Sequence, residues 1–171
     1  MVTTILVLVP AVKDPLLAWI SLGDEPGVAP ASLERVRALL NTDDRFHGVE
    51  HLGPEVPREV VGVRDALRAY LVDESRTGLD ALAASHPVVM AFGAEPRLVP
   101  VVPSDTVAGL LAEVFDAQRD GSWQRLKACA NPDCQWIYYD ASRNRSGRWC
   151  SMGECGDVMK ARAYRERGRR A

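Results

Sequence analysis

Four cysteines near the end of the chain carry the clearest chemical signal. Cys129 and Cys134 have four residues between them, Cys150 and Cys155 are spaced identically, and fifteen residues separate the two pairs. Two short loops of this kind can each present two thiolates to one ion, and four soft sulfur ligands are typical of zinc. We therefore predict that the four cysteines hold Zn²⁺. Four protein ligands leave zinc no open position, so we expect a structural metal.

Three other fates of the cysteines stay open at this point: a pair of disulfides, an iron-sulfur cluster, or four unligated buried thiols. Disulfides require an oxidising compartment, which a secreted protein reaches through a signal peptide. The apolar run from Ile5 to Val12 has no Lys or Arg before it, unlike the apolar part of such a signal. It is also too short to cross a bilayer. We expect a cytoplasmic protein with no membrane partner.

Charge is divided unevenly along the 171 residues, although the net charge is only −2. Residues 1–120 contain 10 basic and 18 acidic side chains, whereas residues 121–171 contain 11 basic and 5 acidic ones. The second part also contains all four cysteines and three of the four tryptophans. This asymmetry predicts two domains, residues 1–120 and residues 121–171.

The hydrophobic pattern predicts an α+β fold, with a helix-rich N-terminal domain that contains a small antiparallel sheet. Helices are expected over residues 31–40, with Ser32 as the N-cap, over residues 58–76, and from Ser104-Asp105 to about residue 120. Residues 87–92 and 97–102 flank a turn sequence and predict a hairpin. The run Ile5–Val9 predicts a strand that could pair with this hairpin.

In the C-terminal part, the pattern predicts a treble-clef-like zinc finger. Residues 135–139 and Arg148-Trp149 are expected to form the two strands of a hairpin between the cysteine loops. Residues 157–167 contain neither Pro nor Gly and predict a helix, with Asp157 at its positive end. We interpret Trp136 and Trp149 as packing residues of this small module.

The finger is basic, which favours nucleic acid as a partner. On the predicted helix, positions 158, 162, 165 and 169 lie on one stripe. The candidate phosphate contacts lie on this helix and in the loop before it: Arg143, Arg145, Arg148, Lys160, Arg162, Arg165 and Arg169.

The other groups of polar residues give weaker evidence for a metal site or a catalytic site. His47 and His51 have helical metal-site spacing, but their polar surroundings predict a loop, so we expect no second metal there. The sequence has no glycine-rich phosphate loop and no nucleophile motif, so we expect no enzymatic activity.

The C-terminal part resembles the CGNR zinc finger family. The resemblance rests on Arg125-Leu126-Lys127, Cys129, Cys134, Trp136, Asp140, Ser142-Arg143-Asn144-Arg145-Ser146, Arg148-Trp149-Cys150-Ser151-Met152 and Cys155-Gly156. Bacterial proteins of this family carry the finger behind an ABATE domain and are described as stress-induced transcriptional regulators. The resemblance implies zinc ligation by the four cysteines and DNA binding by the finger. Upstream, residues 39–42 and 63–68 resemble ABATE segments, whereas residues 1–38 look like an addition or a diverged start of that domain.

The chain departs from the motif that names the family, because Asp157-Val158 stands where the pattern has Asn-Arg. Our first hypothesis is a DNA-binding regulator whose N-terminal domain dimerises or receives a protein or small-molecule signal. The alternative is a zinc-stabilised protein-interaction module that binds no nucleic acid, which the lost arginine favours. A thiol redox switch that releases zinc is compatible with both.

Overall fold

The computed structural model describes residues 27–30 and 32–170. The strand predicted over Ile5–Val9 lies outside these residues. Within the described part of the chain, no helix is long and apolar enough to cross a membrane.

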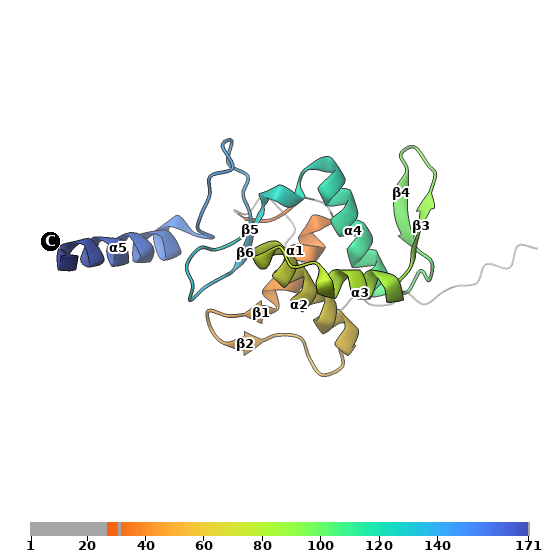
Figure 1. The fold of residues 1–171 in the computed structure, drawn as a ribbon, viewed down its shortest axis with the longest axis horizontal. Coiled ribbons are helices and arrows are strands. Elements are labelled where there is room, and N and C mark those ends of the chain that lie inside the picture. Colours follow the sequence, from red (N-terminus) through yellow and green to blue (C-terminus); the bar gives the residue numbers. More distant parts are fainter. Residues whose placement is uncertain (1–26, 31, 171) are drawn as a thin grey trace, which may run out of the picture.

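Three helices form the centre of the fold: α1 (Leu33–Asn41), α2 (Arg58–Asp73) and α4 (Thr106–Asp120) (Figure 1). Their apolar stripes meet in one core in which Val36, Leu39, Val63, Leu67 and Leu110 have no exposed surface. The three predicted helices are thus confirmed. A further helix, α3 (Thr77–Ser85), was not predicted; it packs beside α2.

Local signals explain most of the helix ends. Asp105 accepts a hydrogen bond from the Ala108 amide at 2.9 Å and caps α4, and Gly121 ends it with φ 83°. Helix α2 ends three residues earlier than expected because Glu74 adopts a left-handed conformation. Ser32 is the N-cap residue of α1, as predicted, but its side chain forms no capping hydrogen bond.

Within residues 27–30 and 32–170, the strands form three two-stranded antiparallel sheets. Strands β3 (Val88–Ala91) and β4 (Arg97–Pro100) form the predicted hairpin. The stretch expected to be a loop contains β1 (Asp43–Asp44) and β2 (Val49–Glu50). The third sheet pairs β5 (Leu126–Ala128) with β6 (Ile137–Tyr139).

The predicted return strand at Arg148-Trp149 is wrong. Strand β6 pairs instead with β5, which precedes the first cysteine, in the register Leu126 to Tyr139. The Arg148 carbonyl accepts a hydrogen bond from the Ala130 amide at 2.8 Å, so the chain returns to the first cysteine loop and not to β6.

The third sheet lies in the same core as the helices. Leu126 and Ile137 pack with the residues of α1 and α2, and Trp123 stacks on Tyr70 of α2 with ring centroids 5.7 Å apart. The guanidinium group of Arg68 in α2 donates to the carbonyls of Leu40 and Gln135. A boundary after residue 120 stays a prediction, and the apolar core is continuous across it.

The chain ends in a π-helical turn, η2 (Met152–Gly156), followed by α5 (Asp157–Arg170). The predicted helix is confirmed and extends three residues further. Figure 1 shows α5 projecting away from the body of the molecule. Helix α5 packs mainly against η2, and most of its residues are exposed to solvent.

Candidate metal centre and basic surface

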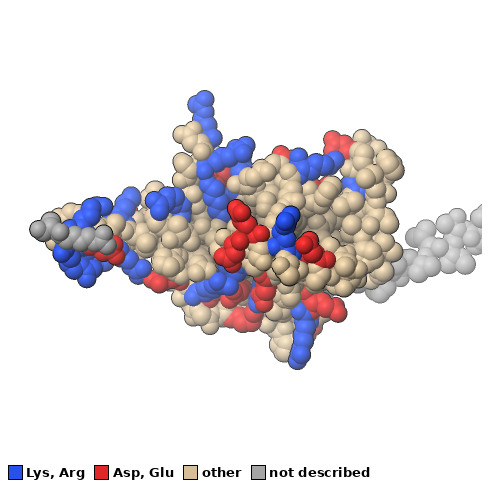
Figure 2. All heavy atoms as spheres, in the orientation of Figure 1, with Lys and Arg blue, Asp and Glu red and all other residues tan. Residues whose placement is uncertain are grey.

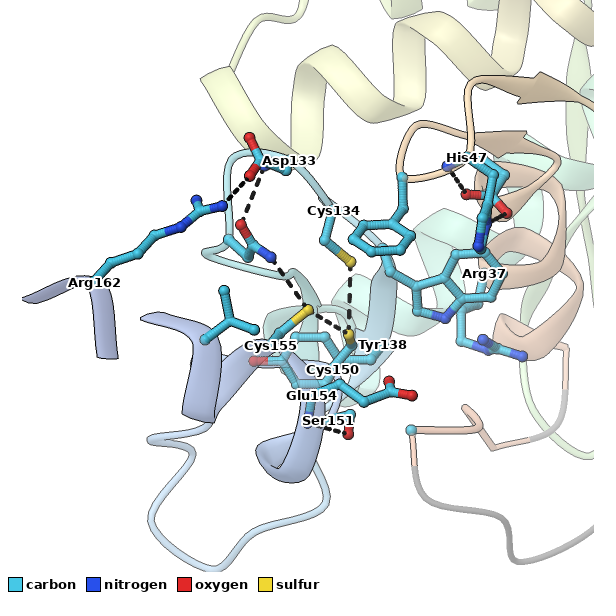
Figure 3. Close-up of a pocket in the computed structure, with 16 residues that line it drawn as sticks. Arg37, His47, Asp133, Cys134, Tyr138, Cys150, Ser151, Glu154, Cys155 and Arg162 are labelled. Atoms are coloured by element: carbon cyan, nitrogen blue, oxygen red, sulfur yellow. Dashed lines mark hydrogen bonds and ion pairs between the residues drawn. The ribbon is translucent and has the colours of Figure 1, made fainter. Parts of the chain in front are cut away.

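The two cysteine loops bring four sulfur atoms together. All four Sγ atoms lie within 4.8 Å of one another, with Cys134 Sγ 3.7 Å from Cys150 Sγ and Cys150 Sγ 3.8 Å from Cys155 Sγ (Figure 3). A tetrahedral zinc site with Zn–S bonds of about 2.3 Å has S–S edges of about 3.8 Å. The cluster therefore has the dimensions of a four-thiolate metal site. Three of the cysteines are buried, and Cys150 is half-buried.

The electrostatics of the cluster favour a bound cation. Burial raises the pKa of the Cys134 thiol to about 12. Burial and the neighbouring Cys134 raise the pKa of Cys150 as well. Four thiolates in so small a volume repel one another and leave water at a high cost. A divalent metal ion removes both penalties, because it deprotonates the sulfurs and neutralises half of their charge.

Asn131 supports the cluster from the first cysteine loop. Its side chain is 2% exposed, and its Nδ2 donates to Cys155 Sγ at 3.5 Å. Burial opposes ionisation of Cys155, but the hydrogen bonds from Asn131 and the other thiols lower its pKa overall. The Asn131 carbonyl accepts from the Cys134 amide at 2.9 Å. One buried residue thus orients a sulfur from each cysteine pair.

Asp140 holds the long loop between the two cysteine pairs. Its buried carboxylate accepts from Lys127 Nζ at 2.6 Å, from the Ser142 amide at 3.1 Å and from the Gly147 amide at 2.8 Å. Lys127 Nζ also donates to the Arg145 carbonyl. These bonds close residues 140–147 into a compact loop that extends Arg143 and Arg145 outward.

The structure spreads the predicted phosphate contacts over two surfaces, the loop and α5, which Figure 2 shows as concentrations of basic side chains. In the loop region, Arg143 and Arg145 are exposed, and Arg148 lies over the Trp149 ring, 5.1 Å from its centroid. On α5, Arg165 and Arg169 are exposed.

Two basic residues of α5 have acidic partners. Arg162 Nη2 lies 2.7 Å from Asp133 Oδ2 in the first cysteine loop, which ties α5 to that loop (Figure 3). Lys160 Nζ lies 3.6 Å from Asp157 Oδ1. Val158, at the position of the missing arginine, is 43% exposed.

The structure also bears on the predictions for the tryptophans and His47, and it shows two contacts that were not predicted. Trp136 and Trp149 are partly buried against the cysteines, as expected of packing residues. His47 Nδ1 lies 2.8 Å from Asp44 Oδ2, in the turn between β1 and β2 and not on a helix. Sequence reasoning missed the support given by Asn131 and the cap of η2, where Ser151 Oγ accepts from the Glu154 amide at 3.3 Å. The Ser-x-x-Glu pattern was the readable signal for that cap.

Comparison with known proteins agrees with the geometry. A search of curated proteins finds no match to this chain. The likeness of residues 39–42 and 63–68 to the ABATE domain stays a prediction. Residues 125–168, which include all four cysteines and nearly all of α5, match the CGNR zinc finger family, and this confirms the family indicated by the sequence motif.

Proposed function

We propose that this chain is a zinc-dependent DNA-binding regulator of transcription, with α5 and the 142–148 loop as the contact surface. The observation that carries the proposal is the placement of α5. This helix of 14 residues projects from the body (Figure 1). Four of its basic side chains are exposed: Lys160, Arg165, Arg167 and Arg169 (Figure 2). The helix is about 21 Å long, and a projecting helix of that kind fits the major groove of DNA.

Three arginines in the C-terminal half of α5 are the strongest candidates for phosphate contact. Arg165, Arg167 and Arg169 are exposed, and none of them forms an ion pair with another described residue. Arg162 differs because Asp133 neutralises it. A phosphate would have to displace that carboxylate.

In this proposal the zinc is structural. The four cysteines would hold it, and it would fix η2 and thereby the direction in which α5 leaves the body. Asn131 holds a sulfur of the cluster, and the hydrogen bonds of Asp140 hold the loop that carries Arg143 and Arg145.

Salt-dependent binding tests the proposal. Zinc-loaded full-length protein is titrated with mixed genomic duplex fragments over a salt series, beside an Arg165→Ala/Arg169→Ala variant. The slope of log affinity against log salt is about 0.9 for each phosphate that the protein neutralises. The variant should neutralise two phosphates fewer, so we expect its slope to be flatter by nearly two.

A matched control removes two arginines from the other end of the molecule. Arg58 begins α2 and Arg97 begins β4; both are exposed, and Arg58→Ala/Arg97→Ala makes the same change in net charge. This control is expected to keep the parent slope. Equal slopes for all three proteins would refute the assignment of α5.

One observation favours a second candidate function, a protein-interaction module. Met152, Val158 and Tyr164 are 59%, 43% and 73% exposed, and all lie on η2 or α5. Large apolar side chains that remain exposed are candidates for contact with a protein partner. This function gains support if the zinc-loaded protein binds no duplex even at low salt.

A further inference from the structure

A cavity of about 650 Å³ lies between the finger and the N-terminal elements, beside the sulfur cluster. Its finger side includes the sulfur-bearing Cys134, Cys150 and Cys155. Arg37 of α1 and His47 of the β1–β2 turn lie on the opposite side (Figure 3). The volume is that of sites that take small organic molecules.

Aromatic rings from both sides line the cavity. Phe46 comes from the β1–β2 turn, Trp136 from the segment after Cys134, and Tyr138 from β6. Phe46 is 57% exposed, so its ring stands at the edge of the cavity, whereas Tyr138 is buried.

The cations of the wall are neutralised by partners. Arg37 donates two hydrogen bonds of 2.6 Å to the Glu34 carboxylate, and Arg162 pairs with Asp133 at 2.7 Å. His47 Nδ1 lies 2.8 Å from Asp44 Oδ2, and His51 Nε2 lies 3.9 Å from the same oxygen.

The cavity wall keeps a net negative charge after these pairs are counted. Glu154 forms no ion pair with a described residue, and Figure 3 shows its side chain extending from η2 toward the side that carries Arg37. The four cysteines with a bound Zn²⁺ would add a net charge of −2 next to the cavity. Such a surplus, facing aromatic rings, attracts cations and repels anions.

We propose that this cavity binds a small lipophilic organic cation. Ring faces attract a cation through their quadrupoles, and a poorly hydrated organic cation loses little when it leaves water. Glu154 supplies the opposite charge, and Phe46 closes one side over the ligand. This site borders the proposed DNA surface at Val158 and Arg162 of α5, and its test does not depend on DNA binding.

Two probes of the same shape and opposite charge test the proposal. Zinc-loaded full-length protein is titrated by calorimetry with tetraphenylphosphonium and, separately, with tetraphenylborate. We expect saturable binding of one phosphonium ion per chain and no binding of the borate. If the borate binds as tightly as the phosphonium, the proposal is overturned, because the shape of the probe and not its charge would then determine the affinity. Failure of phosphonium to saturate the protein by ~1 mM would overturn it too.

Two variants locate the site. Glu154→Gln removes the unpaired charge and Phe46→Ala removes the exposed ring, and each is expected to weaken phosphonium binding about three- to tenfold. Both side chains are exposed, so neither change disturbs the core. Glu95→Gln and Phe92→Ala make the same chemical changes at the exposed β3–β4 hairpin and are expected to leave binding unchanged. Parent-like binding by Glu154→Gln and Phe46→Ala would refute the assigned site.

Discussion

The side chain of Asn41 and the backbone of Ile137 exchange two hydrogen bonds of 2.8 Å each. Asn41 Nδ2 donates to the Ile137 carbonyl, and the Ile137 amide donates to Asn41 Oδ1. Asn41 is 2% exposed and Ile137 is fully buried. The amide side chain therefore acts as a short additional strand beside β6. It joins the last residue of α1 to the segment between the two cysteine pairs.

Replacing this amide tests how strongly the two parts are joined. Asn41→Ala leaves the amide and the carbonyl of Ile137 without partners in a dry core, and each unpaired group costs about 1–3 kcal/mol. We expect the free energy of unfolding to fall by about 2–4 kcal/mol, measured by urea denaturation of the zinc-loaded protein. Asn144→Ala, in the exposed loop, is the control and should change it by less than ~0.5 kcal/mol. An equally small loss for Asn41→Ala would contradict the proposed role.

Removal of the metal should destabilise helices α1 and α2 as well as the finger. Separate domains would predict that Cys155→Ala unfolds residues 129–165 alone. Leu126 and Ile137, however, pack in the core of α1 and α2, and β6 lies between the cysteine pairs. We expect chelation of the metal, or Cys155→Ala, to lower hydrogen-exchange protection in α1 and α2 as well as in β5 and β6. Unchanged protection in α1 and α2, with loss confined to the finger, would instead support the prediction of two domains.

The sequence predicted what depends on short spacings. The cysteine loops, the start of α4 at Ser104-Asp105 and the β3–β4 turn each lie within a few residues, so their chemistry is readable locally. Helix α3 was missed because its residues follow α2 after a short break and none of its side chains is buried. Its apolar pattern is correspondingly weak.

The sequence could not predict which segments pair when they lie far apart in the chain. The pattern at residues 135–139 predicted a strand, but nothing in it distinguished a partner at 126–128 from one at 148–149. The bond between Asn41 and Ile137 spans 96 positions, and no periodicity marks such a contact. The charge asymmetry describes the surface of the protein, so it gives no information on the apolar core to which residues on both sides of position 120 contribute.

Asp140 should give stability a specific dependence on pH. Burial opposes its ionisation, but the hydrogen bonds from Lys127 and from Ser142 and Gly147 outweigh burial and hold its pKa far below the ordinary value. A lowered folded-state pKa means that this stabilisation is fully present above the unfolded-state pKa of about 3.9. It is lost progressively as the pH falls below about 5 toward the folded-state value.

The comparison with Asp140→Asn isolates this contribution from acid release of the metal, which affects both proteins. We expect the variant to be less stable by about 2 kcal/mol at pH 7 and the difference to shrink between pH 5 and pH 3. Urea denaturation at each pH measures it. A difference that stays constant over this range would mean that the Asp140 charge contributes nothing.

Two glycine substitutions with opposite expected signs test the rigidity of the basic loop. A Cβ atom added at Gly147 would lie 2.9 Å from Asp140 Cγ and 3.0 Å from both carboxylate oxygens. That carboxylate cannot move aside without breaking its bonds to Lys127 and the loop amides. We therefore expect Gly147→Ala to lower the free energy of unfolding by about 1–3 kcal/mol. Its binding to DNA should weaken as well, because Arg143 and Arg145 lose their fixed positions.

Gly168 provides the matched control within the same module. An added Cβ meets nothing within 4 Å there, and the residue lies inside α5. Alanine favours a helix over glycine by about 0.5–1 kcal/mol, so Gly168→Ala should stabilise α5 and preserve DNA binding. Thermal denaturation and the salt-series titration measure both variants. If Gly147→Ala were as stable as the parent, the Asp140 carboxylate would have to be free to move, and the loop would not be rigid.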